Sequence, residues 1–276
     1  MKRILTIQDI SCVGKCSLTV ALPIISAMGV ETAIIPTAVL STHTMFQNFT
    51  FKDLTDQILP ICDHWQAEKI GFDGIYTGYL GSFEQIDIMA KLFRSFKTPE
   101  NVILVDPVMA DNGKLYPAFD EAFAAKMAEL CGEADIIVPN ITEACFMTGM
   151  PYKETYDEAY IQELLAKLSK LGAKVSILTG VSFKPGTTGV MGFDSRTGET
   201  YYYCHEKLPR NYHGTGDIFS STCVGAMMMG KPWQEAVQVA ADYTAECIRL
   251  TMADPEGRTY GVNFEQAIPY LLERMK

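Results

Sequence analysis

The segment Gly214-Thr215-Gly216-Asp217 has the residue types of a turn that handles phosphate. Two glycines around a threonine let the backbone turn sharply and direct several N–H groups at one point. The apolar stretch from about Ile218 to Met229 predicts a helix that begins here, and a helix N-terminus attracts anions. A carboxylate at this place suits a base that removes a proton from the group attacking the anion. Asp217 is therefore a candidate general base, and the alternative is a plain glycine turn in which Asp217 stabilises the helix dipole.

Two further aspartates follow a predicted buried strand. Asp106 comes directly after the apolar run from Val102 to Val105, and Asp111 lies in an Asp-Asn-Gly turn shortly afterwards. In parallel sheets, ligands bind beyond the carboxyl ends of the strands. A carboxylate at such an end can reach a metal ion or a metal-bound phosphate.

Asn140 and Glu143 lie one helical turn apart after another predicted strand. Taken alone, this pair is typical of a capping box, in which each side chain satisfies a backbone N–H of the other residue. Taken with Asp106 and Asp111, its oxygen atoms have the chemistry that Mg²⁺ prefers. If these acids meet Asp217 at one end of one sheet, they favour metal-assisted phosphoryl transfer over four unrelated structural acids.

The elements that must position these groups alternate between strands and helices, which predicts a parallel sheet covered on both faces. The expected strands are Ile4 to Gln8 (ending in Asp9), Val30 to Val39, Gly74 to Thr77, Val102 to Val105, Ile136 to Val138 and Val175 to Leu178 (ending in Thr179-Gly180). A hairpin is expected around Asp194 to Gly198, and helices over Gly14 to Met28, Asp53 to Trp65, Pro232 to Leu250 and Phe264 to Arg274. No linker or repeat interrupts the chain, so we expect one domain over residues 1–276.

Composition excludes several classes of protein. The 276 residues are 48% hydrophobic and 20% charged, which indicates a globular protein with an ample core. The net charge of −10, without a dense basic run, argues against nucleic acid or an anionic membrane as partner. The eight cysteines contain no CxxC pair, so we expect reduced thiols in a cytoplasmic protein with no export signal. Neither a complete Walker A loop nor a GxGxxG or GxSxG motif is present.

Several motifs together resemble the ribokinase-like superfamily and, within it, the pyridoxal/pyridoxamine kinases. The resemblance covers essentially the whole chain. Its carriers are Ile7-Gln8, Ser41-Thr42-His43-Thr44, Thr77-Gly78-Tyr79-Leu80-Gly81-Ser82, Asp106-Pro107-Val108-Met109, Pro139-Asn140-Ile141-Thr142-Glu143 and Gly214-Thr215-Gly216-Asp217. The resemblance implies a three-layer α/β/α sandwich with a mainly parallel central sheet.

The resemblance also implies a role for each candidate residue in the transfer of the ATP γ-phosphate to the 5′-hydroxymethyl group of a B6 vitamer. Asp217 would be the base, and the amides of Gly214, Thr215, Gly216 and Asp217 would form the anion hole. The substrate would meet Asp9, Ser11, His43, Thr44 and Tyr79. The ATP phosphates would be approached by Asp106, Asn140, Glu143, Thr179 and Gly216, with Mg²⁺ organised, mostly through water, by Asp106, Asp111 and Glu143. Members of the family often need K⁺ and act as homodimers.

One position departs from the family pattern. Asp9 stands where many of these kinases have a serine, and Ser11 follows two residues later. A carboxylate facing a ring nitrogen favours its protonated form, whereas a hydroxyl serves the neutral ring. This leaves the preferred vitamer open, and also whether the substrate is the related hydroxymethylpyrimidine. Pyrimidine kinases usually carry cysteine at the position of Asp217, so Asp217 favours the B6 branch. The alternatives are a hydroxymethylpyrimidine or sugar kinase of this superfamily and a non-catalytic B6-binding protein.

Overall fold

The computed structural model describes all residues, 1–276, and its strands form one nine-stranded sheet and one two-stranded sheet. The strands are β1 (Arg3–Ser11), β2 (Glu31–Leu40), β3 (Phe51–Asp53), β4 (Gly74–Thr77), β5 (Val102–Val105), β6 (Ala110–Asp111), β7 (Lys114–Leu115), β8 (Ile136–Ile137), β9 (Val175–Val181), β10 (Thr187–Asp194) and β11 (Glu199–Glu206). The order across the large sheet is β11-β10-β9-β8-β5-β4-β1-β2-β3. The pairs β1–β2, β5–β8 and β8–β9 are parallel, whereas β10 pairs antiparallel with both β9 and β11.

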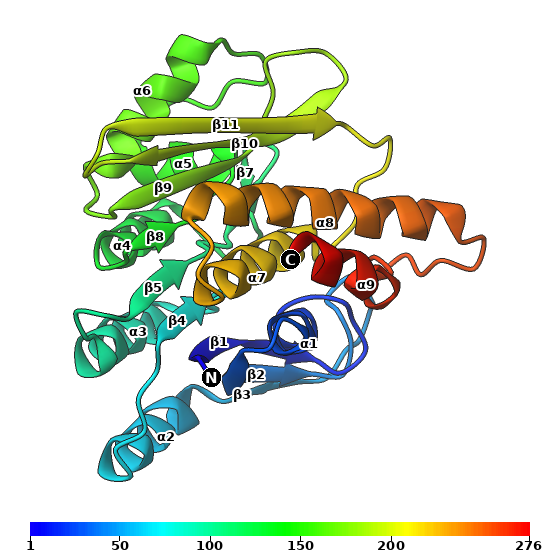
Figure 1. Cartoon of the computed structure of the whole chain (residues 1–276). Coiled ribbons are helices and arrows are strands. Elements are labelled where there is room, and N and C mark those ends of the chain that lie inside the picture. The colour runs from blue at the N-terminus through cyan, green and yellow to red at the C-terminus, as the bar shows by residue number, and fades with distance from the viewer. The chain divides into compact units, whose positions relative to one another are not determined.

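Helices flank this sheet, so the predicted α/β class with a mainly parallel sheet is confirmed (Figure 1). The helices are α1 (Leu18–Ala27), α2 (Thr55–Ala67), α3 (Phe83–Phe96), α4 (Glu121–Gly132), α5 (Ile141–Thr148), α6 (Glu158–Ser169), α7 (Thr215–Met228), α8 (Trp233–Ala253) and α9 (Phe264–Arg274). None of them combines the length and apolarity needed to span a bilayer. All eight cysteines are free thiols.

The chain divides into two compact units. Unit 1 comprises Met1–Tyr76 and Lys207–Lys276, and unit 2 comprises Thr77–Glu206. Each unit holds part of the candidate site and is described by itself below. The expectation of one domain over residues 1–276 stays a prediction.

The core of unit 1 surrounds α7, the helix that begins after Gly214. All residues of α7 from Ile218 to Ala226 are buried, including three hydroxyl-bearing ones. A cluster of buried side chains from α1, α7, α8 and α9 surrounds it, and in this cluster the Tyr243 hydroxyl donates to the Phe264 carbonyl at 2.9 Å. A helix that is buried on every side is fixed by its surroundings rather than by one amphipathic face. The residues of its first turn are therefore held in place by the core.

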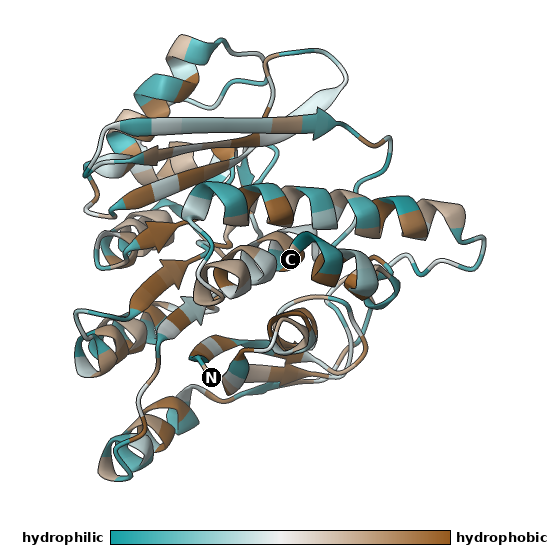
Figure 2. Cartoon of the chain, viewed as in Figure 1, coloured by the Kyte–Doolittle hydropathy of each residue, from teal (hydrophilic) through white to brown (hydrophobic).

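In unit 2, short strands of purely apolar residues form the centre. Both β5 and β8 are almost wholly hydrophobic and are coloured brown in Figure 2. Such continuous apolar runs are typical of strands buried on both faces. The polar residues that follow these strands lie at their carboxyl ends, where ligands bind in this class of sheet.

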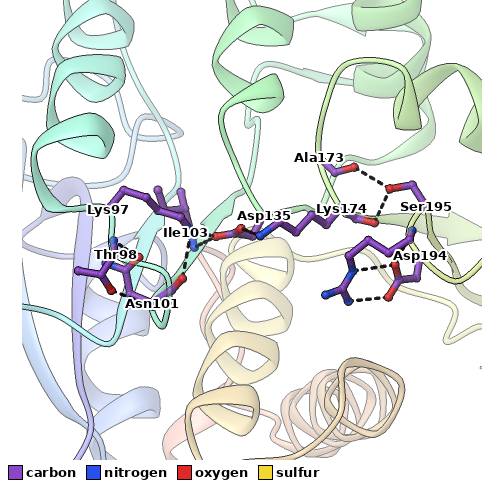
Figure 3. A network of polar contacts seen from close by, with 10 residues as sticks. Lys97, Thr98, Asn101, Ile103, Asp135, Ala173, Lys174, Asp194 and Ser195 are labelled. Carbon is purple, nitrogen blue, oxygen red and sulfur yellow. Dashed lines mark hydrogen bonds and ion pairs between the residues drawn. The ribbon is translucent and has the colours of Figure 1, made fainter.

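A charged network fixes the opposite ends of the same strands. The Asp135 carboxylate, directly before β8, forms ion pairs with Lys97 and Lys174 and accepts a hydrogen bond from the Ile103 amide at 2.8 Å (Figure 3). The Ser195 hydroxyl adds a hydrogen bond to the Lys174 carbonyl at 3.0 Å. The network thus ties together the amino-terminal ends of β5, β8 and β9.

We expect Asp135→Asn to lower the free energy of unfolding by about 1–3 kcal/mol, because hydrogen bonds to a charged group are lost. Burial opposes the ionisation of Asp135, but the hydrogen bonds from Lys174 and Lys97 outweigh it and hold its pKa below the usual range. The stability that Asp135 contributes is therefore complete above the pKa of the unfolded chain, about 3.9, and is lost as pH falls through the folded pKa. Urea unfolding of wild type and variant at pH 7 and near pH 3 measures this.

The control is Glu133→Gln, which breaks the exposed ion pair between Glu133 and Arg94. We expect this variant to lower the free energy of unfolding by less than about 1 kcal/mol, with little dependence on pH, because exposed ion pairs contribute little to stability. Equal losses for the two variants at pH 7 would contradict the special role of Asp135.

Several predicted boundaries were wrong, and three of them have identifiable physical reasons. The first strand does not end before Asp9 but continues to Ser11, with a shift of register between Gln8 and Ile10. The first helix begins at Leu18 rather than Gly14, because Ser17 has a positive φ of 51° that a helix excludes. Strand β9 continues through Thr179 because its antiparallel partner β10 extends the ladder. Each of these depends on a partner elsewhere in the chain.

Candidate active site

The start of α7 has the predicted geometry. Gly214 occupies the N-cap position with φ 77° and ψ 0°, a left-handed conformation that glycine adopts without strain. A Cβ at this position would collide with the carbonyl oxygen of Lys15. The Gly214 carbonyl accepts from the Ile218 amide at 3.0 Å, and the Thr215 hydroxyl donates to the Tyr212 carbonyl at 3.2 Å. The N–H groups of a helix's first turn have no acceptor within that helix, so this turn is suited to an anion.

Asp217 lies in the first turn of α7 and is half-buried. Burial, and then the nearby carboxylates of Asp217 and Asp9, raise the pKa of the Cys16 thiol to about 12. Both carboxylates therefore lie near the same thiol within unit 1. The structure brings together a predicted catalytic residue and a predicted substrate-binding residue that are 208 positions apart in sequence (217 − 9).

The segment before α1 supports this turn. Lys15 resembles a phosphate-binding lysine by its Gly-Lys sequence, but its Nζ pairs with Glu265 at 2.8 Å and lies over the Phe264 ring. Its backbone carbonyl packs against Gly214. Lys15 therefore connects the start of α9 to the turn of α7, a role that no local sequence signal could reveal.

His43 and Thr44 lie in the loop between β2 and β3. The His43 amide donates to the Val13 carbonyl at 2.9 Å, and the His43 ring lies 4.7 Å from that of His213, next to Gly214. Burial, and then the neighbouring His213, lower the pKa of His43, which favours the neutral imidazole. Thr44 is exposed in the turn that follows, and Ser11 is buried at the end of β1. The structure thus places His43 beside the glycine turn, a contact the sequence could not show.

In unit 2, the first turn of α5 holds the loop that carries the predicted metal-binding residues. Asn140 and Glu143 form the capping box that their spacing suggested. The second carboxylate oxygen of Glu143 accepts from the Met109 amide at 3.1 Å, and the Asn140 side chain donates to the Ala110 carbonyl at 2.8 Å. These bonds fix the backbone just after Asp106.

The carboxylates of Asp106 and Glu143 are both buried and lie near each other. Burial, and then the negative charge of Asp106, raise the pKa of Glu143 well above its usual range. Asp111 differs, because it is exposed in the β6–β7 hairpin, where its carboxylate accepts from the Asn112 amide at 2.8 Å. No group of three or more His, Cys, Asp or Glu side chains in the chain is arranged to hold a metal ion. A cation at Asp106 would therefore find at most two carboxylates close together.

Thr179 and Tyr79 are the remaining predicted residues of unit 2. Thr179 lies in β9, and its amide donates to the Pro139 carbonyl at 2.9 Å, which places it beside Asn140 in a parallel bridge. Tyr79 is half-buried in the turn after β4, with its ring 5.7 Å from that of Phe119. In unit 2 the contacts thus connect Asp106, Glu143, Asn140 and Thr179, and the meeting of these residues with those of unit 1 stays a prediction.

Comparison with models of known protein families shows which family this chain belongs to. The model described as phosphomethylpyrimidine kinase matches residues 21–261. The chain belongs to this family. The family has the ribokinase-like fold, so the chain is a small-molecule kinase of that superfamily, as its motifs implied. The matched range includes the glycine turn at Gly214 and all the predicted residues of unit 2, but begins after Asp9 and Ser11.

Similar proteins include one named for a form of vitamin B6 and one named for thiamine biosynthesis. The chain is 30% identical to the pyridoxine kinase of Bacillus subtilis over 188 residues, which are 66% of each chain. It is 31% identical to the thiamine biosynthesis bifunctional protein of Geobacter sulfurreducens over 192 residues, which are 70% of this chain but only 38% of that protein. The match to these two relatives thus leaves a third or more of each of them uncovered.

A solved structure matches along nearly the whole chain. It is a candidate phosphomethylpyrimidine kinase from Bacteroides thetaiotaomicron, crystallised with pyridoxal. It is 37% identical, with a TM-score of 0.92, and the match covers 98% of this chain and 95% of that one. The similarity to this structure therefore extends over nearly the whole chain.

Proposed function

We propose that this protein transfers the γ-phosphate of ATP to the 5′-hydroxymethyl group of pyridoxal, pyridoxamine or pyridoxine. The observation that carries the proposal is the carboxylate of Asp217 in the first turn of the buried helix α7, directly after the left-handed Gly214. Asp217 takes the proton of the substrate hydroxyl as its oxygen attacks the phosphorus atom. The new O–P bond forms as the bond to the ADP oxygen breaks, and the amides of residues 214–217 stabilise the transferred phosphoryl group.

Unit 2 supplies the proposed contacts to the ATP phosphates through Asn140 and Thr179. The residues there also fit Mg²⁺, because two buried carboxylates, Asp106 and Glu143, lie close together, and burial and then the charge of Asp106 raise the pKa of Glu143. Both oxygens of Glu143 already accept backbone N–H groups, so Asp106 is the residue we expect to hold the ion, with Asp111 and Glu143 acting through water. When bound, Mg²⁺ neutralises charge on the phosphate oxygens.

The proposed contacts to the substrate ring come from Asp9, Ser11, His43, Thr44 and Tyr79. Asp9 is 8% exposed, and burial raises its pKa, while hydrogen bonds from Ser17 and Ser11 act in the opposite direction. A buried carboxyl group of this kind is suited to a ring nitrogen that holds a proton. The need for K⁺, the homodimer and the cytoplasmic location implied by the resemblance stay predictions.

A second candidate function is the phosphorylation of hydroxymethylpyrimidine. It is supported by the family model and by the relative from thiamine biosynthesis. Asp217 argues against this function, because pyrimidine kinases usually have cysteine at that position. The two functions use the same fold and the same attack on phosphorus, and they differ in the ring that is bound.

A competition assay distinguishes the two. The protein is given Mg²⁺, ATP and equal concentrations of pyridoxal, pyridoxamine, pyridoxine, hydroxymethylpyrimidine and ribose, and each phosphorylated product is measured by mass spectrometry. We expect the B6 vitamers to have the highest kcat/KM. Faster phosphorylation of hydroxymethylpyrimidine would establish the second candidate, and no product from any acceptor would show that both are wrong.

A further inference from the structure

Ser17 has a backbone conformation that would suit glycine better. Its φ of 51° and ψ of −133° lie in a region that residues with a Cβ rarely adopt. Ser17 is buried at the N-cap position of α1, where a serine hydroxyl usually accepts from the helix's own backbone. Here the hydroxyl makes no such bond. A residue kept in a strained conformation, without its usual local role, needs another explanation.

The hydroxyl of Ser17 is directed at Asp9. It donates to Oδ1 of Asp9 at 2.6 Å, and both side chains are buried. This short distance is typical of a hydrogen bond from a hydroxyl to an ionised carboxylate. The strain at Ser17 therefore places a hydrogen-bond donor on a buried carboxylate in another element.

Asp9 lies opposite an irregularity of the β1–β2 ladder. The register shifts between Gln8 and Ile10, where Asp9 alone in β1 faces two residues, Thr37 and Ala38, in β2. Bulges of this kind change the direction of a side chain and are frequent next to active sites. The hydrogen bond between Ser17 and Asp9 thus joins two separate backbone irregularities, the strained conformation of Ser17 and the extra residue of β2 opposite Asp9.

The groups around this pair connect it with the start of α7. Cys16 precedes Ser17, and its thiol lies near the carboxylates of both Asp217 and Asp9. Ser11, on the same strand, contributes a second hydrogen bond to Asp9. The charged or titratable groups near this pair are Cys16, from the segment before α1, and Asp217, from α7. His43, from the loop between β2 and β3, lies close to Ser11 across Gly14. All of these residues belong to unit 1.

We propose that Ser17 is a positioning residue that fixes the carboxylate of Asp9 against the substrate ring and so contributes to the choice of ring. This inference rests on the proposed function. The chemical class it selects is a heteroaromatic alcohol with a ring nitrogen that holds a proton. The Ser17 hydroxyl stabilises the ionised form of Asp9, and an ionised carboxylate accepts a hydrogen bond from that nitrogen. Both residues precede the range that the family model matches.

The test is Ser17→Gly, which removes the hydroxyl and at the same time relieves the backbone strain. We expect an unchanged or higher Tm, a KM for pyridoxal about 10-fold higher and a nearly unchanged kcat, since one hydrogen bond to a charged group is lost. The pKa of Asp9 should rise further without its donor, so the acid limb of the kcat/KM profile should move to higher pH. A role confined to the folding of α1 would change neither KM nor this limb.

Asp9→Asn and the double variant complete the cycle. Asp9→Asn should raise KM, and adding Ser17→Gly to it should change KM by no more than experimental error. The matched control is Thr19→Val, which removes a hydroxyl bonded to the Gly14 and Cys16 carbonyls in the same segment. We expect this control to lower Tm without moving the acid limb.

Wild-type values of KM and of the acid limb in Ser17→Gly would overturn the role of Ser17 while leaving the proposed function intact. If wild type prefers hydroxymethylpyrimidine, the same comparison is made with that acceptor, and the same outcomes decide. Absence of wild-type turnover with every acceptor would overturn the proposed function and, with it, the inference on Ser17.

Discussion

Replacing Asp217 with asparagine should lower kcat by about 10²- to 10⁴-fold, the usual contribution of a general base. The substituted amide has the shape of the carboxylate but cannot take the proton of the attacking hydroxyl. Because the start of α7 is fixed by a core that the substitution does not touch, the affinity for ATP should change little. Steady-state kinetics with pyridoxal gives kcat, and titration with a fluorescent ATP analogue gives the affinity.

The control for this experiment is a measurement of the free energy of unfolding of the variant. The negative charge of Asp217 also stabilises the N-terminal end of α7 through the helix dipole. Its replacement should therefore lower the free energy of unfolding by about 0.3–1 kcal/mol. A loss of activity larger than such a cost can explain, in a protein that remains folded, points to the chemical step. Full activity in Asp217→Asn and in Asp217→Ala would show that Asp217 is not the base.

Gly214→Ala should lower kcat/KM by about 10²-fold, because misplacing a catalytic turn by about 1 Å has effects of this size. The positive φ of 77° alone costs about 1–2 kcal/mol for a residue with a Cβ. In addition, the new methyl group would collide with the Lys15 carbonyl, so the turn or the segment before α1 must move. Tm and kcat/KM, measured on the same preparation, should therefore both fall.

Gly230→Ala is the matched control, since Gly230 follows the other end of α7 with φ 93° and has no atom near the site of a Cβ. An alanine at this position has a similar strain from its positive φ, but its methyl group meets no other atom. We expect a lower Tm with unchanged kinetics. If Gly214→Ala behaves in the same way as Gly230→Ala, the turn at Gly214 does not position the reacting groups.

Local patterns located most elements of the fold correctly. Strands β4 and β5 and helix α9 have the predicted bounds, because continuous apolar runs and a regular helical period depend only on neighbouring residues. The hairpin of β10 and β11 is also confirmed around its predicted turn. The errors occurred at the ends of β1 and β9, where pairing with another strand determines the conformation, and at the start of α1, where Ser17 has a positive φ.

The sequence by itself determined the turn at Gly214 and the helix that follows it, because glycine torsions and helix dipoles act within a few residues. It likewise determined the capping box of Asn140 and Glu143. It could not show that Ser17 donates to Asp9, nor that the Lys15 carbonyl packs against Gly214. Those contacts join segments that only strand register, a bulge and helix packing bring together, so the tertiary structure alone decided them.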